Sequence, residues 1–542
     1  MLAARSLAPA LALFVAAACA AEDLPQLPEL APAPSVIPAA VTVKRLTRSQ
    51  YTSTIRELLG EVAVPIALEP DAEVDGFLAL GGATTSISAL GVERYESAAY
   101  DVAAQALDND AIRARILPCE PADATQPDPA CAEEVVRSFG LRAFRRPLGE
   151  EEIARYTDIA VLAAEKLGSF RDGVEFALAG LLQSPHFLFR VELGEPDPDA
   201  PGRRRYSSYE MASRLAYFLW GTTPDDALLA AASKGELVTT AGLEREADRL
   251  LASPRARLGV RTFFEERFAL HRLDDLVKDT SVFPSMSADL GPDAREETLA
   301  SLEELVFDRD EPYPSLMTRR RTIVNRRLAS LYGVPASSLD GFAPVTLAED
   351  GPRRGLFGQA SILALYSHST ATSSTLRGKF IRTALLCATI PPPPADVDTS
   401  LPEPSEVMPT LRDRMAEHVT NPVCASCHTF LDPIGLGLEQ FDGLGRFRTT
   451  EQGATIDPTG ELDGAKFQDA RGLGEAVASH PDFAGCLTRH LYRYATGVRE
   501  RDGDEPLIGW LTERFGASGL RIKPLLREIV LSEGFRFGTE AP

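Results

Sequence analysis

Apolar and polar positions along this chain mostly repeat with the spacing of an amphipathic helix. In LTRSQYTSTIRELLG, the apolar residues between Tyr51 and Leu59 fall on one helical face. Thr47, followed three residues later by Gln50, forms the pattern of a capping box and predicts the start of this helix. Gly60 predicts its end.

The same pattern returns in the middle of the chain. In SSYEMASRLAYFLWG, Ser207 and Glu210 predict a second capped helix that ends at Gly221. In TTPDDALLAAA, Pro224 after Thr223 is expected to occupy the first position of the next helix.

A longer amphipathic stretch follows, GLEREADRLLASPRARLGVRTFFEERFALHRL, and Pro254 is expected to break it into two helices. No segment shows the sustained two-residue alternation of a large sheet. The pattern therefore predicts a mainly α protein, a multi-module helical body.

Polar segments rich in proline and glycine divide this body. The clearest is PPPPADVDTSLPEPSEV (391–407), because consecutive prolines cannot continue a helix. The predicted division is a signal (1–20), a Pro-rich tether (21–40), helical modules (41–105, 119–193 with a disulfide loop, and 205–335), a module that contains a Cys-x-x-Cys-His motif (353–462), and a C-terminal helical module (466–540).

Composition narrows the classes of partner. The chain has 542 residues, 44% of them hydrophobic, and a net charge of −22. A surface of this sign repels phosphate backbones and anionic lipid, so we expect no nucleic-acid partner and no electrostatic adhesion to a membrane.

The N-terminus has the features of an export signal. Arg5 precedes the apolar run LAPALALFVAAA, which is too short to span a bilayer. VAAAC resembles a lipobox with Cys19 as the lipidated residue, whereas Ala18-Cys19-Ala20 would be a cleavage site that releases a soluble protein. The tether DLPQLPELAPAPSVIPAA favours the lipid anchor. We expect an exported protein, periplasmic or at the cell surface, and an outer-membrane lipoprotein whose only membrane contact is that anchor.

Export places the seven cysteines in an oxidising compartment, where thiols tend to pair. Cys119 and Cys131 bracket a loop rich in proline and aspartate, and a disulfide that closes a loop of this size contributes about 3 kcal/mol. Cys387 and Cys486 could form a second bridge. With Cys19 assigned to lipid, this count leaves Cys424 and Cys427.

These two cysteines belong to the pentad CASCH, residues 424–428, whose Cys-x-x-Cys-His spacing is that of covalent attachment of haem c. Two thiols one helical turn apart can reach two vinyl groups on one haem edge, and His428 can then bind the iron as proximal ligand. The alternatives are a zinc site with His418 or His428, a thioredoxin-type redox pair, and a structural disulfide.

Residues near the pentad extend this hypothesis. Asp432-Pro433 is expected to end the attachment helix. Arg446 either neutralises a haem propionate or pairs with a nearby carboxylate on a solvated face. His368, in the Ser/Thr-rich loop LYSHSTATSSTLRGKF, is a candidate second ligand to the iron, or else a hydrogen-bonding loop residue. Other side chains that offer a ligand atom are Met408, Met415, His418, His480 and His490.

The order of sequence blocks resembles a family of exported bacterial proteins. The blocks are RLTRSQYTSTIRELLG; FGLRAFRRPLGEEEIARY with LLQSPHFLFRVE; YEMASRLAYFLWGTTPDDALL; GLFGQASILALYSHSTATSSTLRGKFIRTALLCATIPPPP with CASCHTFLDPIGLGLEQFDGLGRFR; and LTRHLYRYATGVRE with LLREIVLSEGFRF. They resemble, in this order, the domains of unknown function fifteen-eighty-seven, fifteen-ninety-five, fifteen-ninety-two, fifteen-eighty-eight and fifteen-eighty-five, found in multi-module proteins described as cytochrome-c-like. The resemblance implies a helical body with a C-terminal c-type haem module and no assigned activity.

The sequence thus leads to one main expectation and one alternative. The main expectation is an exported c-type monohaem protein that transfers electrons or supports a haem-dependent oxidation at the cell envelope, with a redox partner protein or small-molecule substrate. The alternative is a non-haem surface scaffold or binding lipoprotein, in which Cys424 and Cys427 form a structural disulfide or a metal site. No catalytic residue is predicted.

Overall fold

The structure, a computed structural model, describes residues 32–65, 67–391, 402–420 and 422–540, without the side chains of residues 417, 418, 422, 423 and 426. This part of the chain is mainly helical, as predicted, and its strands form only small antiparallel sheets of two or three strands. No helix in it is both long and apolar enough to cross a membrane. The predicted signal, Cys19 and most of the tether lie outside the described residues.

The elements of the described residues lie between Thr42 and Thr539. The α-helices are α1 (Arg48–Leu59), α2 (Leu78–Gly81), α3 (Ala89–Asp108), α4 (Asp110–Ile116), α5 (Pro129–Phe144), α6 (Glu150–Leu167), α7 (Phe170–Leu182), α8 (Pro185–Leu188), α9 (Ser208–Leu219), α10 (Asp226–Ser233), α11 (Thr240–Ala252), α12 (Ala256–Arg267), α13 (Leu290–Glu303), α14 (Ser315–Thr318), α15 (Arg326–Tyr332), α16 (Ala360–Leu365), α17 (Ser374–Phe380), α18 (Leu411–His418), α19 (Pro422–Gly435), α20 (Ala470–Ala478), α21 (Pro481–Thr496), α22 (Glu505–Ala517), α23 (Ile522–Leu531) and α24 (Glu533–Arg536). The strands are β1 (Thr42–Arg45), β2 (Phe189–Glu192), β3 (Glu195–Pro196), β4 (Arg203–Arg205), β5 (Arg321–Val324), β6 (Ala343–Thr346), β7 (Thr450–Glu451), β8 (Ala454–Thr455), β9 (Gly460–Leu462), β10 (Ala465–Phe467) and β11 (Phe537–Thr539).

Helix ends with local capping signals lie where the sequence predicts them. The Thr47 hydroxyl accepts a hydrogen bond from the Gln50 backbone N–H, and the Gln50 side chain accepts one from the Thr47 backbone N–H. At its other end, α1 stops at Gly60. Ser207 and Glu210 cap α9 in the same way. Each capping box satisfies two backbone donors that have no partner inside the helix.

One predicted helix start is wrong. Pro224 precedes α10 instead of occupying its first position, because Asp225 is the cap and its carboxylate accepts a hydrogen bond from the Leu228 backbone N–H at 2.8 Å. An aspartate that accepts this bond is the stronger start signal. The predicted break near Pro254 is confirmed, since α11 ends at Ala252 and α12 begins at Ala256.

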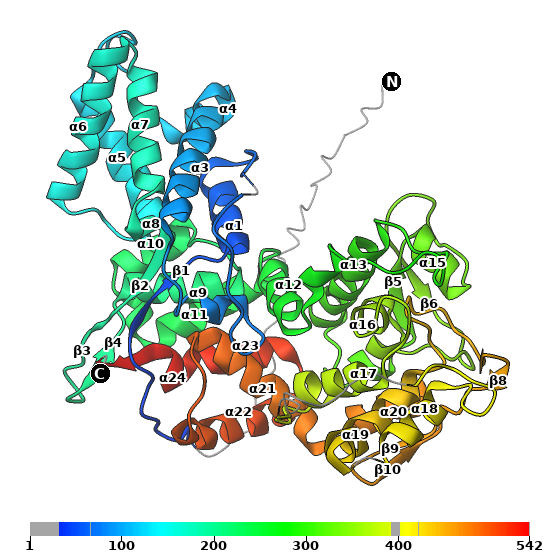
Figure 1. Cartoon of the computed structure of the whole chain (residues 1–542). Coiled ribbons are helices and arrows are strands. Elements are labelled where there is room, and N and C mark those ends of the chain that lie inside the picture. The colour runs from blue at the N-terminus through cyan, green and yellow to red at the C-terminus, as the bar shows by residue number, and fades with distance from the viewer. Residues whose placement is uncertain (1–31, 66, 392–401, 421, 541–542) are drawn as a thin grey trace, which may run out of the picture.

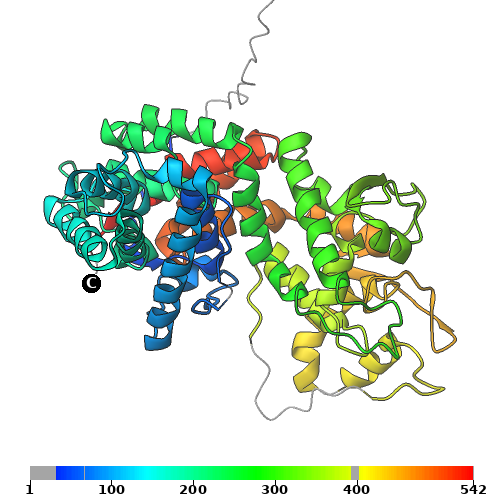
Figure 2. The same cartoon turned by 90° about the horizontal axis from the view of Figure 1, so that it is seen from above.

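The first two predicted modules share one hydrophobic core. Helices α1, α3, α5, α6 and α7 pack around it, and they form the bundle at the left of Figure 1 and of Figure 2. Strands β1 and β2 pair in antiparallel register below this bundle, with Thr42 opposite Glu192. The segments 41–105 and 119–193 thus share a core, although Phe77 and Leu80 of the first segment belong to the second core.

The last three predicted modules share a second core. It contains apolar side chains from α9, α11 and α12, from the segment around α16 and α17, and from α20 to α23. Helix α23 near the C-terminus lies against α11, and β11 pairs with β4. The lobe that holds α13 and α15 to α20 extends to the right in Figure 1.

A buried charge cluster joins segments that are distant in sequence. Glu192, which is fully buried, accepts a hydrogen bond from the Lys44 ammonium at 2.8 Å and a second from Arg214. The same ammonium donates to the Thr496 carbonyl at 2.7 Å. Buried charges of this kind are tolerated only when they are paired and hydrogen-bonded, so this cluster holds four segments in register.

Glu266 on α12 is a buried carboxyl whose titration should make stability depend on pH. Its Oε2 accepts a hydrogen bond from the Ala79 backbone N–H at 3.1 Å, and burial raises its pKa from 4.5 to about 8. The folded state therefore binds this proton more tightly than the unfolded chain does, and its contribution to the free energy of unfolding falls as the pH rises between these two values.

In the variant Glu266→Gln, the side chain stays neutral at every pH. We therefore expect this decrease in the free energy of unfolding to be absent. The free energy of unfolding of the variant minus that of the wild type should rise by on the order of a few kcal/mol across that pH interval. Urea denaturation at a series of pH values measures the difference. A difference that does not change with pH would contradict the expectation.

Candidate functional site

The pentad lies on α19, which brings its two thiols and its imidazole to one face of a helix. Residues three and four apart on a helix are neighbours, and this spacing relates Cys424 to Cys427 and to His428. The Cys424 side chain is buried, and those of Cys427 and His428 are half-buried. The two cysteines are thiols and are not bonded to each other in the described structure.

The imidazole of His428 is held by a carboxylate one turn further along α19. Its Nδ1 lies 2.8 Å from Oδ2 of Asp432. The Thr375 hydroxyl donates to Oδ1 of the same carboxylate at 2.8 Å and lies 3.4 Å from the His428 Nδ1. Burial raises the pKa of Asp432, while the His428 charge and the hydroxyls of Thr375 and Ser374 act in the opposite direction. This network fixes the plane of the ring through Nδ1.

Helix α17 positions α19 by very close contact between the two backbones. A Cβ at Gly435 would lie 1.8 Å from the carbonyl oxygen of Ser374, and a Cβ at Gly378 would lie 2.1 Å from that of Leu431. Each distance is far below van der Waals contact, so only glycine fits at these two positions. The close approach of α17 and α19 places Thr375 next to His428 of the pentad.

The segment after the pentad is anchored by one buried arginine. Arg377 on α17 is fully buried and donates to the carbonyls of Leu438, Phe441 and Asp442 at 2.8, 3.0 and 2.9 Å. Its Nη1 also lies 3.6 Å from the buried carboxylate of Glu439. These contacts hold the turn that follows α19 and therefore the end of the helix that bears the pentad.

The expected end of the attachment helix at Asp432-Pro433 is wrong, because α19 continues through Pro433 to Gly435. This extension matters for the site. It places Asp432 inside the helix, one turn after His428, where its side chain can reach the imidazole.

Other predicted site residues lie elsewhere or are not described. His368 is exposed, and no hydrogen bond or ion pair of the described residues joins its side chain to the pentad, although its loop leads into α17. Arg446 is exposed and donates to the Ser285 hydroxyl at 2.7 Å. The His418 side chain lies outside the described residues.

Both predicted disulfides are confirmed. Cys119 is bonded to Cys131 and closes the Pro-rich loop, and Cys387 is bonded to Cys486. The second bridge joins the stretch that follows α17 to α21. The sequence did not single out Thr375, whose contact with His428 spans 53 positions and has no local signal.

Comparison with known families matches five segments of the chain. Every matching family is described as a protein of unknown function: DUF1587 (44–108), DUF1595 (131–192), DUF1592 (206–334), DUF1588 (353–451) and DUF1585 (463–535). No curated protein and no solved structure matches the chain. The five domains and their order are those that the sequence blocks resemble, and the chain is built from these five domains of unknown function.

Proposed function

We propose that this chain is an exported c-type monohaem protein. Haem would be bound by thioether bonds to Cys424 and Cys427, with His428 as proximal ligand to the iron. The protein would transfer electrons or support a haem-dependent oxidation at the cell envelope, to which a lipid on Cys19 would attach it. The matched model of residues 353–451, which include the pentad, bears the short name PSCyt3, and this name agrees with a cytochrome-like module.

The observation that supports the proposal best is the contact between His428 and Asp432. A histidine that binds a metal usually donates its other ring N–H to a carboxylate, which fixes the tautomer and the orientation of the ring. Asp432 accepts a hydrogen bond from the His428 Nδ1 at 2.8 Å. The other ring nitrogen, Nε2, is therefore the one that would bind iron. The two thiols, one turn apart on the same helix face, complete the donor set.

A bound haem would supply one-electron chemistry, and the residues of the chain would set its conditions. Asp432 would make the imidazole a stronger donor and thereby favour the oxidised form of the iron. Thr375 and Ser374 keep the carboxylate in place. His368, on the loop that precedes α17, would remain our candidate for a second ligand to the iron, and Arg446 a candidate partner for a propionate.

The alternative is a non-haem scaffold with Cys424 and Cys427 as a disulfide or metal site. Its disulfide form has no support in the described structure, where both residues are thiols. A zinc site would use the same cysteines with His428, but the adjacent Cys-His pair rarely binds one ion.

Expression in a host with cytochrome-maturation machinery tests the function. We expect a band that stains for haem on a denaturing gel and a reduced absorption spectrum of the c type. The paired variant Cys424→Ser/Cys427→Ser should lose the stain, and the control Cys119→Ser/Cys131→Ser should keep it because it leaves the pentad intact. A colourless wild-type band would refute the proposal.

A further inference from the structure

The Cys387–Cys486 disulfide lies in the wall of a large cleft. The cleft has a volume of about 1360 Å³ and is lined by residues of α12, α17, α21 and α22 together with both cysteines. Cys387 is half-buried, while Cys486 is buried. Cys387 is thus the more exposed of the two cysteines that line the cleft, and the cleft is large enough for a small-molecule ligand.

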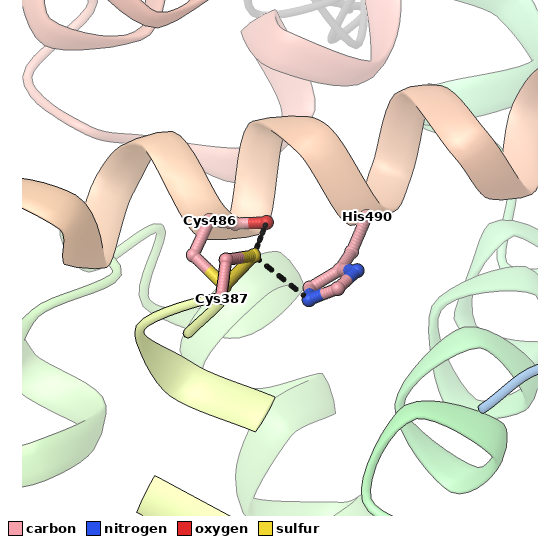
Figure 3. A group of neighbouring side chains, drawn as sticks. All are labelled: Cys387, Cys486 and His490. Carbon is pink, nitrogen blue, oxygen red and sulfur yellow. Dashed lines mark hydrogen bonds between the residues drawn. A yellow bond between two sulfur atoms is a disulfide. The ribbon is translucent and has the colours of Figure 1, made fainter. Parts of the chain in front are cut away.

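His490 lies directly beside this disulfide (Figure 3). It follows Cys486 by one turn of α21, and its Nε2 lies 3.1 Å from the Cys387 sulfur. Because a disulfide sulfur carries no hydrogen, this contact is a hydrogen bond only if Nε2–H donates. Nδ1 is then an acceptor; it is buried and has no hydrogen bond of ordinary geometry among the described residues, although the Thr383 backbone also contacts the ring.

Positive charges act on His490 beside this disulfide. Burial and the positive charges of Arg267, Arg493 and Arg489 hold the pKa of His490 well below 6.5, so the ring is neutral. Arg489 and Arg493 are paired with Glu500 and Glu505, whereas Arg267, which lines the same cleft, forms no ion pair within the described part of the chain. Positive charges near a cysteine favour its thiolate, which is both the nucleophile and the leaving group of thiol–disulfide exchange.

The other disulfide of the chain lacks this environment. In the Cys119–Cys131 bridge one cysteine is also half-buried and the other buried, but the Cys119 sulfur contacts a backbone carbonyl, that of Cys131. No histidine of the described residues contacts it. The two bridges thus have similar exposure and different neighbours.

We propose that Cys387, Cys486 and His490 form a thiol–disulfide exchange centre for small thiol compounds that enter the cleft. A thiolate attacks the Cys387 sulfur, the sulfur–sulfur bond breaks, and its electron pair leaves with Cys486, which takes up a proton. A second thiolate attacks the bound thiol's sulfur in the mixed disulfide and releases Cys387 as a thiolate beside the His490 N–H. Two thiols are oxidised to one disulfide, and the protein disulfide is reduced to two thiols.

Glutathione provides the test, with the Cys119–Cys131 bridge as a control inside the same molecule. In the full-length oxidised protein, iodoacetamide first blocks existing thiols, including any at Cys424 and Cys427. Reduced glutathione is then added, new thiols are labelled with N-ethylmaleimide at intervals, and peptide mass spectrometry gives a rate for each bridge. We expect Cys387–Cys486 to react at least about tenfold faster.

Equal rates, or a slower Cys387–Cys486 bridge, would overturn the proposal without any variant. His490→Leu tests the histidine. It should lower the Cys387–Cys486 rate by about tenfold and leave the Cys119–Cys131 rate unchanged. An unchanged ratio in a variant with the wild-type circular dichroism spectrum would exclude a role for His490. The result is independent of haem, because the rates are read from the peptides of the two bridges and not from the pentad.

Discussion

Replacing Gly435 by Ala is expected to destabilise the part of the chain that carries the pentad by about 3 kcal/mol. The added Cβ would lie 1.8 Å from the Ser374 carbonyl oxygen and 2.5 Å from the carbonyl carbon of the same residue. Both obstacles are backbone atoms of α17, so no side chain can rotate away. Helices α17 and α19 would have to separate, and Asp432 and His428 would then lose the contact with Thr375.

Gly509→Ala is the matched control for this variant. Gly509 lies within α22, and a Cβ there meets no atom within 4 Å. Because alanine favours a helix more than glycine does, the control should be neutral or more stable by up to about 1 kcal/mol. Urea denaturation followed by circular dichroism measures both variants. A Gly435→Ala protein with the wild-type midpoint would contradict the close crossing of the two helices.

Replacing Asp432 by Asn is expected to raise the midpoint potential of a haem bound at the pentad. The carboxylate that accepts from the His428 Nδ1 at 2.8 Å makes the ring a stronger donor and favours oxidised iron. A charge-assisted hydrogen bond contributes about 1.5–3 kcal/mol, and about 1.4 kcal/mol corresponds to 59 mV in a one-electron couple. If roughly half of this hydrogen-bond energy is present only when the iron is oxidised, its loss should raise the potential by about 50 mV.

Asp442→Asn is the control for the potential. Asp442 belongs to the same block, but its Oδ1 accepts hydrogen bonds from the backbone N–H groups of Leu444 and Arg446, away from His428. Spectroelectrochemical titration should show a higher potential for Asp432→Asn only. A potential that rises equally in both variants, or in neither, would show that the contact with His428 does not tune the iron.

Features encoded by neighbouring residues could be predicted from the sequence. The capping boxes at Thr47 and Ser207 depend on residues three apart, and both are confirmed. Cysteine counting predicted the two bridges because an even number of cysteines remains once Cys19 and the pentad are set aside, and this leaves few pairings. The start at Pro224 failed because the next residue, Asp225, provides a side-chain cap.

Features that depend on tertiary contact could not be predicted. Thr375 reaches His428 only because two glycines let α17 and α19 touch, and neither glycine has a distinctive local pattern. The position of His490 beside Cys387 joins residues 103 positions apart. Likewise, the Pro-rich segment at 391–407 separates blocks in sequence, yet residues on both sides of it contribute to one core.

The central claim is that Cys424 and Cys427 bind haem covalently, and the mass of one peptide tests it most directly. Trypsin should release residues 415–446, which contain both cysteines and His428, from protein produced with cytochrome-maturation machinery. We predict that this peptide is heavier by one haem, and that the Cys424→Ser/Cys427→Ser peptide carries only the mass of its substitutions. An unmodified wild-type peptide, from cells that mature a control cytochrome, would contradict the claim.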